Sequence, residues 1–221
     1  MKGFFVLFGP PGAGKSTECG KAFQDSLYIA SAPNNLHFYK QWLTTPEGKA
    51  SGLRPPKTEI VIDQFSVTLD GKPHITMGAN GLPNPVVQKA ALENYARMAI
   101  GKGYEAQAKG QPPPWNYVIF DELGTFWNRV FQEVSPTSLT KDGKHNPLGA
   151  FGLVADWSQQ MTNNLRQLLN VNIGVVFICH DQEPEVEKDK KGGPKLPSQG
   201  IQRQICADAD GALLRTLEDA A

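Results

Sequence analysis

The sequence of 221 residues predicts an α/β protein built on a mostly parallel sheet. Three short apolar runs, at residues 3–8, 117–120 and 174–179, are typical of strands that a parallel sheet buries on both faces. Stretches with helical spacing of apolar residues alternate with these runs, as in strand–helix–strand units. The length suits one core, so we expect residues 1–221 to form a single domain.

The other elements follow in order from apolar spacing and turn residues. In chain order they are a helix at 16–24, a strand at 26–31, a helical turn at 36–43, a surface loop at 44–57, a helix at 85–108, a helix at 124–134, a loop at 135–150, a helix at 153–169, a charged flexible loop at 181–200 and a last strand at 210–215. We expect Phe38 and Trp42 on the inner face of the helical turn.

A β-hairpin is expected before the long helix at 85–108. Residues 58–69 are rich in β-branched side chains, and Asp70-Gly71 is a two-residue hairpin signal. Residues 75–77 would form the return strand. We therefore predict a small insertion at 58–78 on the edge of the sheet.

Composition and charge narrow the functional classes. Lys and Arg total 22, as do Asp and Glu, so the net charge of zero argues against a globally basic nucleic-acid binder and leaves room only for a local basic patch. Cys19, Cys179 and Cys206 form no CxxC pair, which indicates buried, reduced thiols rather than a disulfide framework or a zinc site. The longest apolar run is far shorter than the ~20 residues of a membrane span, so we expect a cytoplasmic protein with no membrane partner.

The strongest motif follows the first strand. It reads Gly9-Pro10-Pro11-Gly12-Ala13-Gly14-Lys15-Ser16-Thr17 and matches GxxxxGK[ST] throughout. Its glycines would let backbone N–H groups wrap the phosphates of a nucleotide. Lys15 would reach the β- and γ-phosphates, and the Ser16 hydroxyl would ligate Mg²⁺. We predict that residues 9–17 bind ATP with Mg²⁺.

A pair of carboxylates follows the strand at 117–120. Asp121 stands at the carboxyl end of this apolar run, as in a Walker B motif, and is the candidate residue on the metal side of the site. Glu122 could polarise a water toward the γ-phosphate and is the candidate general base. Asp63, after the apolar residues 60–62, is a competing metal residue, although it lies in the expected hairpin.

His180 follows the apolar run at 174–179. If that strand lies between those that carry the P-loop and Asp121, the imidazole would stand beside the γ-phosphate and could sense a triphosphate. A structural histidine at a strand end is the alternative. Lys15, Glu122 and His180 are therefore the residues expected to act in catalysis.

Residues 9–17, 118–122 and 175–180, with a Gly/Pro/Lys loop and a last strand after them, resemble the RecA-like ATPases of the ASCE class of P-loop NTPases. More narrowly, they resemble compact phage-encoded AAA-domain ATPases that include RecA-related single-strand-annealing proteins. The resemblance implies a three-layer α/β/α fold with strand order 5-1-4-3-2 and homo-oligomers, rings or filaments, with ATP at subunit interfaces. It also implies action on single-stranded DNA in phage recombination or replication, in the host cytoplasm.

The resemblance also points to basic residues outside the P-loop. In RecA-like proteins the loops after the Walker B helix and after the sensor strand face DNA. The matching lysines here are Lys141 and Lys144 in the first loop, and Lys188, Lys190 and Lys191 in the second. Five acidic residues from Asp181 to Asp189 balance the second set, so a solvated charged loop is the alternative. Candidates for a cation that reaches the γ-phosphate of a neighbouring subunit are Lys195, Arg203 and Arg215.

Two other functions compete with a DNA-dependent ATPase. A small-molecule nucleotide kinase shares the P-loop and the chain length, but such enzymes use an arginine-rich acceptor site, and the six arginines here form no cluster. An ATP-dependent switch that acts on a protein partner would use ATP without DNA. ATP hydrolysis with and without single-stranded DNA, with AMP and nucleosides as phosphoryl acceptors, separates the three classes.

Overall fold

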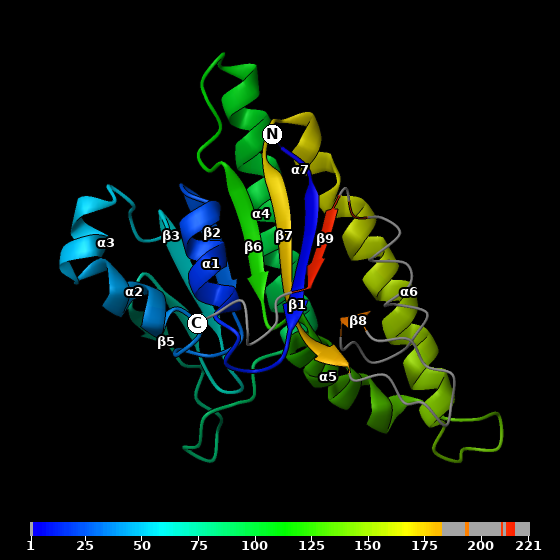
Figure 1. The fold of residues 1–221 in the computed structure, drawn as a ribbon. Coiled ribbons are helices and arrows are strands. Elements are labelled where there is room, and N and C mark those ends of the chain that lie inside the picture. The colour runs from blue at the N-terminus through cyan, green and yellow to red at the C-terminus, as the bar shows by residue number, and fades with distance from the viewer. Residues whose placement is uncertain (1, 183–192, 195–208, 210, 215–221) are drawn as a thin grey trace.

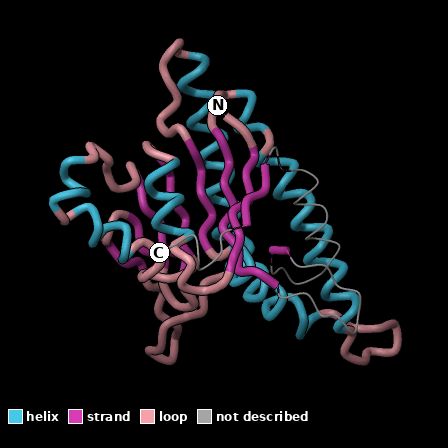
Figure 2. Tube along the Cα trace, in the orientation of Figure 1, coloured by secondary structure: helices cyan, strands magenta, loops and turns pink. Residues whose placement is uncertain are grey.

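A largely parallel sheet with helices on both faces forms the centre of the protein (Figure 1). The computed structural model describes residues 2–182, 193–194, 209 and 211–214. The predicted α/β class with a mostly parallel sheet is confirmed, and Figure 2 shows helices on either side of the strands. Within these ranges, the chain has no helix of the length and apolar character that a membrane span needs.

Parallel strands form the body of the sheet in the described residues. In spatial order they are β3 (Thr58–Ile62), β2 (Ser26–Ala30), β6 (Tyr117–Asp121), β7 (Gly174–Gln182), β1 (Phe4–Gly9) and β9 (Gly211–Leu214). Antiparallel strands extend it: β4 (Val67–Leu69) and β5 (Lys72–His74) continue the edge beyond β3, and β8 (Gly193–Pro194) pairs with the end of β7. The central strands are apolar almost throughout because both faces of the sheet are covered.

Helices cover the two faces of this sheet. They are α1 (Lys15–Ala22), α2 (His37–Leu43), α3 (Pro46–Ala50), α4 (Gln88–Ala108), α5 (Leu123–Val134), α6 (Pro147–Leu165) and α7 (Gln167–Asn170), with a 3₁₀ turn at Ser135–Thr137. On one face, Phe120 of β6 lies in a buried cluster with Trp127 of α5. On the other face, Tyr28 of β2 lies in a cluster with Cys19 of α1 and Tyr39 of α2. The arrangement is compatible with a three-layer α/β/α fold.

The strand order differs from the predicted 5-1-4-3-2. That order contains five parallel strands and leaves residues 58–62 to an inserted hairpin. Instead, β3 pairs in parallel with β2, and the sheet continues past β2. Ile60 and Ile62 are fully buried, so apolar burial stabilises this segment inside the sheet. β7 lies between β1 and β6, which is the place that the resemblance implied for the sensor strand.

The hairpin turn at Asp70-Gly71 is confirmed, but the return strand is not where it was predicted. Asp70 and Gly71 have φ angles of 46° and 80°, as a two-residue hairpin turn of type I′ requires. A turn this short sets the register, so Leu69 pairs directly with Lys72. The return strand is therefore β5 rather than residues 75–77, and the insertion comprises β4 and β5 on the sheet edge.

Two helices begin inside predicted loops because polar N-caps start them. In the predicted loop 44–57, the Thr45 hydroxyl accepts a hydrogen bond from a backbone N–H in the first turn of α3. In the predicted loop 135–150, the Asn146 side chain does the same for α6. Proline follows each cap at the first helical position, which is a sequence signal for a helix start.

The inner face of α2 also differs from the prediction. Phe38 is 72% exposed, and the side chain that packs inward is Tyr39. The Tyr39 ring lies against Gly20 of α1, where an added Cβ would come within 2.5 Å of it. The absence of a side chain on Gly20 therefore makes the space for Tyr39, while Trp42 is half-buried at the margin of the same cluster.

The region after β7 is described only in part. β7 continues to Gln182 and pairs with β8, so these parts of the predicted loop 181–200 are strand, because backbone pairing continues past the apolar run. The rest of that loop lies outside the described residues. Cys19 and Cys179 are buried thiols, as predicted, and Cys206 also lies outside the described residues.

Candidate functional site

Within the described chain, the residues predicted for the nucleotide site meet near the carboxyl ends of β1, β6 and β7. Gly9, the first residue of the P-loop motif, pairs in register with His180 of β7. Asp121 ends β6, and its register partner on β7 is Ile178. Parallel strands end at the same edge of a sheet, so three segments far apart in the sequence come together here.

The loop between β1 and α1 needs glycine at two positions. Gly12 and Gly14 have φ angles of 81° and 75°, a conformation that residues with a side chain rarely adopt. A Cβ added at either position would meet no heavy atom within 4 Å, so open space adjoins the loop. Pro11 is exposed on the loop, whereas Ala13 is fully buried beneath it. Gly14 is also the N-cap of α1, so the positive end of this helix lies beside the open space.

Lys15 is folded over the loop. The residue is only 5% exposed, and its Nζ donates hydrogen bonds to the carbonyls of Gly9 at 3.0 Å and Pro10 at 2.9 Å. Burial raises the pKa of Asp121 and of Glu122, and the positive charge of Lys15 opposes both shifts. The ammonium group therefore lies close to both the loop and the carboxylate pair.

Asp121 is fully buried and is bound through only one of its two oxygens. Asp121 Oδ2 accepts a hydrogen bond from Ser16 Oγ at 2.7 Å and another from the Tyr28 hydroxyl. Asp121 Oδ1 is buried without a hydrogen-bond partner among the described residues. Burial raises the pKa of this carboxyl to about 6, against the hydrogen bonds from Tyr28 and Ser16, which lower it. A buried carboxylate oxygen without a donor indicates a missing partner.

The oxygen atoms of Ser16 and Asp121 are suitable ligands for a magnesium ion. An ionised carboxylate can only accept hydrogen bonds, so Ser16 must donate its proton to Asp121 and keeps its oxygen lone pairs for another partner. Asp121 Oδ1 is a second oxygen ligand of the hard type that Mg²⁺ prefers. In protein sites Mg²⁺ usually takes its remaining ligands from water and substrate phosphates.

Glu122 and His180 form a close pair at the same edge of the sheet. Glu122 is the N-cap of α5 with a φ of 66°, a left-handed conformation that is uncommon for a residue other than glycine. Its Oε2 lies 2.6 Å from His180 Nε2. Burial raises the pKa of Glu122, and Lys15 opposes this shift as described above. The strained turn after β6 therefore directs the candidate base toward the end of β7.

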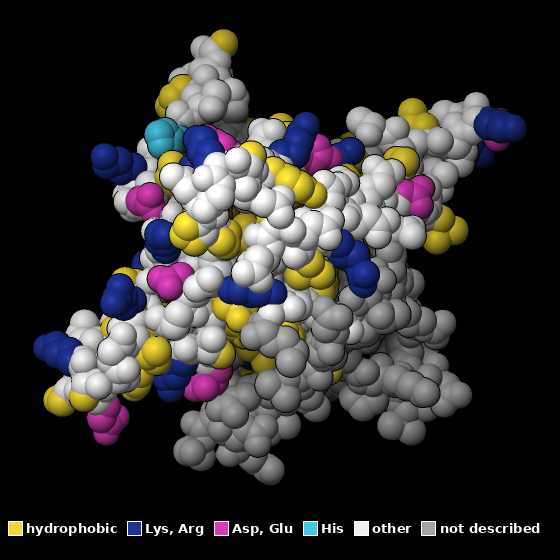
Figure 3. Space-filling model, turned by 90° about the horizontal axis from the view of Figure 1, so that it is seen from above, with side chains coloured by type: hydrophobic (Ala, Val, Ile, Leu, Met, Phe, Trp, Pro, Cys, Tyr) yellow, Lys and Arg dark blue, Asp and Glu magenta, His cyan; other side chains and the backbone are white. Residues whose placement is uncertain are grey.

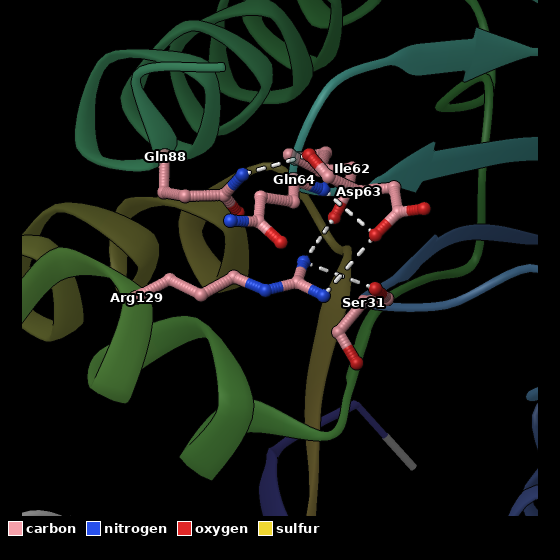
Figure 4. A network of polar contacts seen from close by, with 6 residues as sticks. All are labelled: Ser31, Ile62, Asp63, Gln64, Gln88 and Arg129. Atoms are coloured by element: carbon pink, nitrogen blue, oxygen red, sulfur yellow. Dashed lines mark hydrogen bonds and ion pairs between the residues drawn. The ribbon is translucent and has the colours of Figure 1, made fainter. Parts of the chain in front are cut away.

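Asp63 belongs to a different network. It follows β3, and its carboxylate accepts a hydrogen bond from Arg129 of α5 at 3.3 Å (Figure 4). The same guanidinium donates to the carbonyls of Ser31 at 3.1 Å and Ile62 at 2.8 Å, and Gln88 donates to the Asp63 carbonyl at 2.9 Å. These contacts tie the carboxyl ends of β2 and β3 to α4 and α5. They explain Asp63 as a structural residue, so we do not retain it as a competing metal residue.

The predicted DNA and interface residues are placed only in part. Lys141 and Lys144 are exposed in the loop before α6, which projects from the body of the protein (Figure 1). The loop is held by hydrogen bonds between Thr140 and Lys144 and by a β-bridge of Leu139 with His145. The other candidates lie outside the described residues: Lys188, Lys190, Lys191, Lys195, Arg203 and Arg215.

Charges of both signs are mixed over the surface. On the face seen in Figure 3, Lys and Arg side chains are interspersed with Asp and Glu, as the net charge of zero indicates. This face shows no single basic patch among its described residues.

The sequence pattern did not identify two residues that bind at the strand ends. Tyr28 donates a hydrogen bond to Asp121, and Arg129 donates to the carbonyls at the ends of β2 and β3. Tyr28 lies in a strand that is buried along its whole length. A buried tyrosine hydroxyl usually finds a hydrogen-bond partner, which was the available signal, but the pattern does not say which partner. Arg129 lies in an otherwise amphipathic helix, and nothing in its neighbours indicates the strand ends that it binds.

Comparison of the sequence with protein-family models gave no match, and comparison with curated proteins gave none. Function is therefore inferred from the chain's own residues. The relevant features are the glycine-rich loop, the Asp121 carboxylate with hydrogen bonds at only one of its oxygens, and the Glu122–His180 pair.

Proposed function

We propose that this chain is a P-loop ATPase of RecA-like form that binds ATP with Mg²⁺ and hydrolyses the ATP. The observation that carries the proposal is the 2.7 Å hydrogen bond from Ser16 Oγ to Asp121 Oδ2, between residues 105 positions apart. It joins the P-loop motif to a carboxylate at the end of a buried strand, which is the pairing that a Walker A and Walker B site needs. A chance glycine-rich turn gives no reason for such a contact.

Each residue has a distinct role in the proposed reaction. Loop amides and Lys15 would bind the β- and γ-phosphates, and Ser16 with Asp121 would hold Mg²⁺. When bound, Mg²⁺ neutralises charge on the phosphate oxygens. Glu122 would accept a proton from the water that attacks the γ-phosphate, and the products are ADP and inorganic phosphate. His180 would orient the Glu122 carboxylate through the contact at 2.6 Å.

The RecA-like form of the proposal is supported by the position of β7. This strand lies between β1 and β6, so its end brings His180 next to both Gly9 and Glu122. If β1 and β6 were neighbours, no strand would lie between them to bring a third side chain beside the P-loop and Asp121. The strand between them therefore provides a further side chain at the position proposed for the γ-phosphate.

We extend the proposal to single-stranded DNA as the partner of a homo-oligomer. The exposed Lys141 and Lys144 in a projecting loop support this extension, because such lysines can follow a phosphate backbone. Double substitution of these lysines by alanine should weaken binding to single-stranded DNA and reduce its salt dependence. The exposed Lys102 of α4 and Lys109, which directly follows this helix, supply a matched control, Lys102→Ala with Lys109→Ala, at a distance from this loop in sequence.

One assay tests the proposal and its competitors. ATP hydrolysis is measured with and without Mg²⁺, with and without single-stranded DNA, and with AMP or nucleosides added. Mg²⁺-dependent release of phosphate, raised by the DNA, supports the proposal. Phosphoryl transfer to AMP or a nucleoside would instead identify a small-molecule kinase. Hydrolysis that ignores DNA and rises only with a protein partner would identify a switch.

A further inference from the structure

We infer that Tyr28 is a positioning residue for the divalent cation: it holds the Asp121 carboxylate so that Oδ1 is left for the ion. This inference rests on the proposed function, since it concerns the metal side of the same site. Tyr28 lies on β2, outside both motifs that define the site, and its hydroxyl is one of the two donors to Asp121 Oδ2.

The sheet places Tyr28 where it can reach the carboxylate. β2 and β6 are parallel neighbours, and Ala30 of β2 pairs in register with Asp121. Side chains alternate along a strand, so Tyr28 and Ala30 point to the same face, the one covered by α1. Ala30 has only a methyl group, which leaves the flank of the carboxylate to the longer Tyr28 side chain.

The number of hydrogen bonds that a carboxylate oxygen can accept indicates what the Tyr28 hydroxyl does. A carboxylate oxygen accepts about two hydrogen bonds in its plane. At Asp121 Oδ2 the two acceptor positions are used by Ser16 and Tyr28. Oδ1 is therefore the oxygen left to bind the ion, and it is buried without a hydrogen-bond donor among the described residues. Two donors on one oxygen also fix the rotation of the carboxylate, which a single bond from Ser16 would not.

The hydroxyl of Tyr28 is not explained by packing alone. The ring is fully buried in the cluster with Cys19 and Tyr39, and a phenylalanine would fill the same space. If the ring only filled the core, its hydroxyl would place a polar group in an apolar layer with no benefit. The hydrogen bond to Asp121 is the contact that a phenylalanine would lose.

The test is Tyr28→Phe, which removes the hydroxyl and keeps the ring. Affinity for Mn²⁺ is measured by electron paramagnetic resonance in the complex with a non-hydrolysable ATP analogue. We expect the affinity to fall by about 10-fold, the size of effect found when partners of metal ligands are removed. Binding of the analogue without metal, measured by calorimetry, should stay unchanged because the loop and Lys15 are intact.

Tyr39→Phe is the matched control. Tyr39 is a buried tyrosine in the same layer, and its hydroxyl donates to the Arg54 carbonyl at 2.8 Å rather than to the site. Its Mn²⁺ affinity should equal that of the wild type. Unchanged Mn²⁺ affinity in Tyr28→Phe overturns this inference and leaves the proposed ATPase standing. Failure of the wild type to bind the analogue at all overturns both.

A second measurement keeps the hydroxyl of Tyr28, in case the Phe variant does not fold. The wild-type chain is labelled with 3-fluorotyrosine, and the analogue complex is titrated with Mg²⁺. The fluorine resonance of Tyr28, assigned by elimination with Phe variants of the other tyrosines, should shift, while that of Tyr39 should not. A Tyr28 resonance that ignores saturating Mg²⁺ overturns the inference.

Discussion

Glu122 Oε2 lies 2.6 Å from His180 Nε2, across the ends of the neighbouring strands β6 and β7. The two side chains were expected to act separately, one as general base and one as sensor of the γ-phosphate. Their contact makes them one unit, because a change in the position of His180 moves the hydrogen bond that holds the Glu122 carboxylate. Under the proposed function, the pair would link the state of the bound nucleotide to the candidate base.

Glu122→Gln should keep ATP binding and lose turnover by about 10²-fold or more, because an amide keeps the shape but cannot accept a proton from water. Phosphate release and calorimetry measure the two quantities. Glu105→Gln, an exposed glutamate on α4, is the control and should hydrolyse ATP normally. Near-normal turnover in the Glu122 variant would assign the base to another residue.

His180→Leu should lower turnover by about 10-fold, less than loss of the base itself, because the Glu122 carboxylate loses the group that orients it. His180→Gln keeps a hydrogen-bond donor and should retain more of the rate. Single-turnover kinetics at saturating ATP report this step. Equal rates in the two variants would contradict an orienting role.

Lys15→Ala should abolish ATP binding measurable by calorimetry, because the buried ammonium group is the cation beside the loop. Lys21→Ala is a matched control on the same helix. Lys21 is bonded to Glu18 at 3.1 Å and lies on the surface of α1, so its loss should leave the affinity unchanged. Full affinity in the Lys15 variant would remove the basis of the proposed function.

Asp121→Asn should stabilise the metal-free protein at neutral pH. Burial raises the pKa of Asp121 to about 6 in the folded chain, against an ordinary value of 3.8. Between these values the folded state holds the proton more tightly than the unfolded state, so stability falls as pH rises from about 4 to about 6. The shift corresponds to a loss of about 3 kcal/mol at neutral pH.

The measurement is urea unfolding of both chains from pH 4 to 8 in the presence of a chelator. The fall in stability across that window should be smaller in the Asn variant. Asp156→Asn, an exposed aspartate on α6, should leave the profile as it is in the wild type. If stability falls as much in Asp121→Asn as in the wild type over this pH range, another buried group causes the pH dependence.

Arg129→Ala should reduce the free energy of unfolding by about 2–3 kcal/mol, because it removes the guanidinium that donates to two strand-end carbonyls and to the Asp63 carboxylate. Arg129→Lys should rescue little, since an ammonium group lacks the planar fork that binds several acceptors at once. Arg97→Ala on α4 is the control, because its side chain is 70% exposed and pairs with Glu93 of the same helix. Urea denaturation compares the three variants, and equal stability of Arg129→Ala and Arg97→Ala would refute the role.

Local chemistry explains which parts of the site were predictable. The P-loop motif needs glycines at fixed positions beside a lysine and a serine, so residues 9–17 can be recognised from the sequence alone. Asp121 and Glu122 follow a run of apolar residues that only a buried strand explains. Segment types were recognised for the same reason, whereas β3 was assigned to the hairpin because an apolar run does not reveal its partner strand.

The sequence by itself determined the α/β class, the glycine-rich motif at 9–17 and the adjacent carboxylates of Asp121 and Glu122, because each of these depends on neighbours within a few residues. Only the tertiary structure decided that Tyr28 binds Asp121, that Arg129 closes the ends of β2 and β3, and that Glu122 meets His180. The physical reason is strand order. The Tyr28–Asp121 contact spans 93 residues and exists because β2 and β6 are neighbours, a choice made by the packing of the whole sheet.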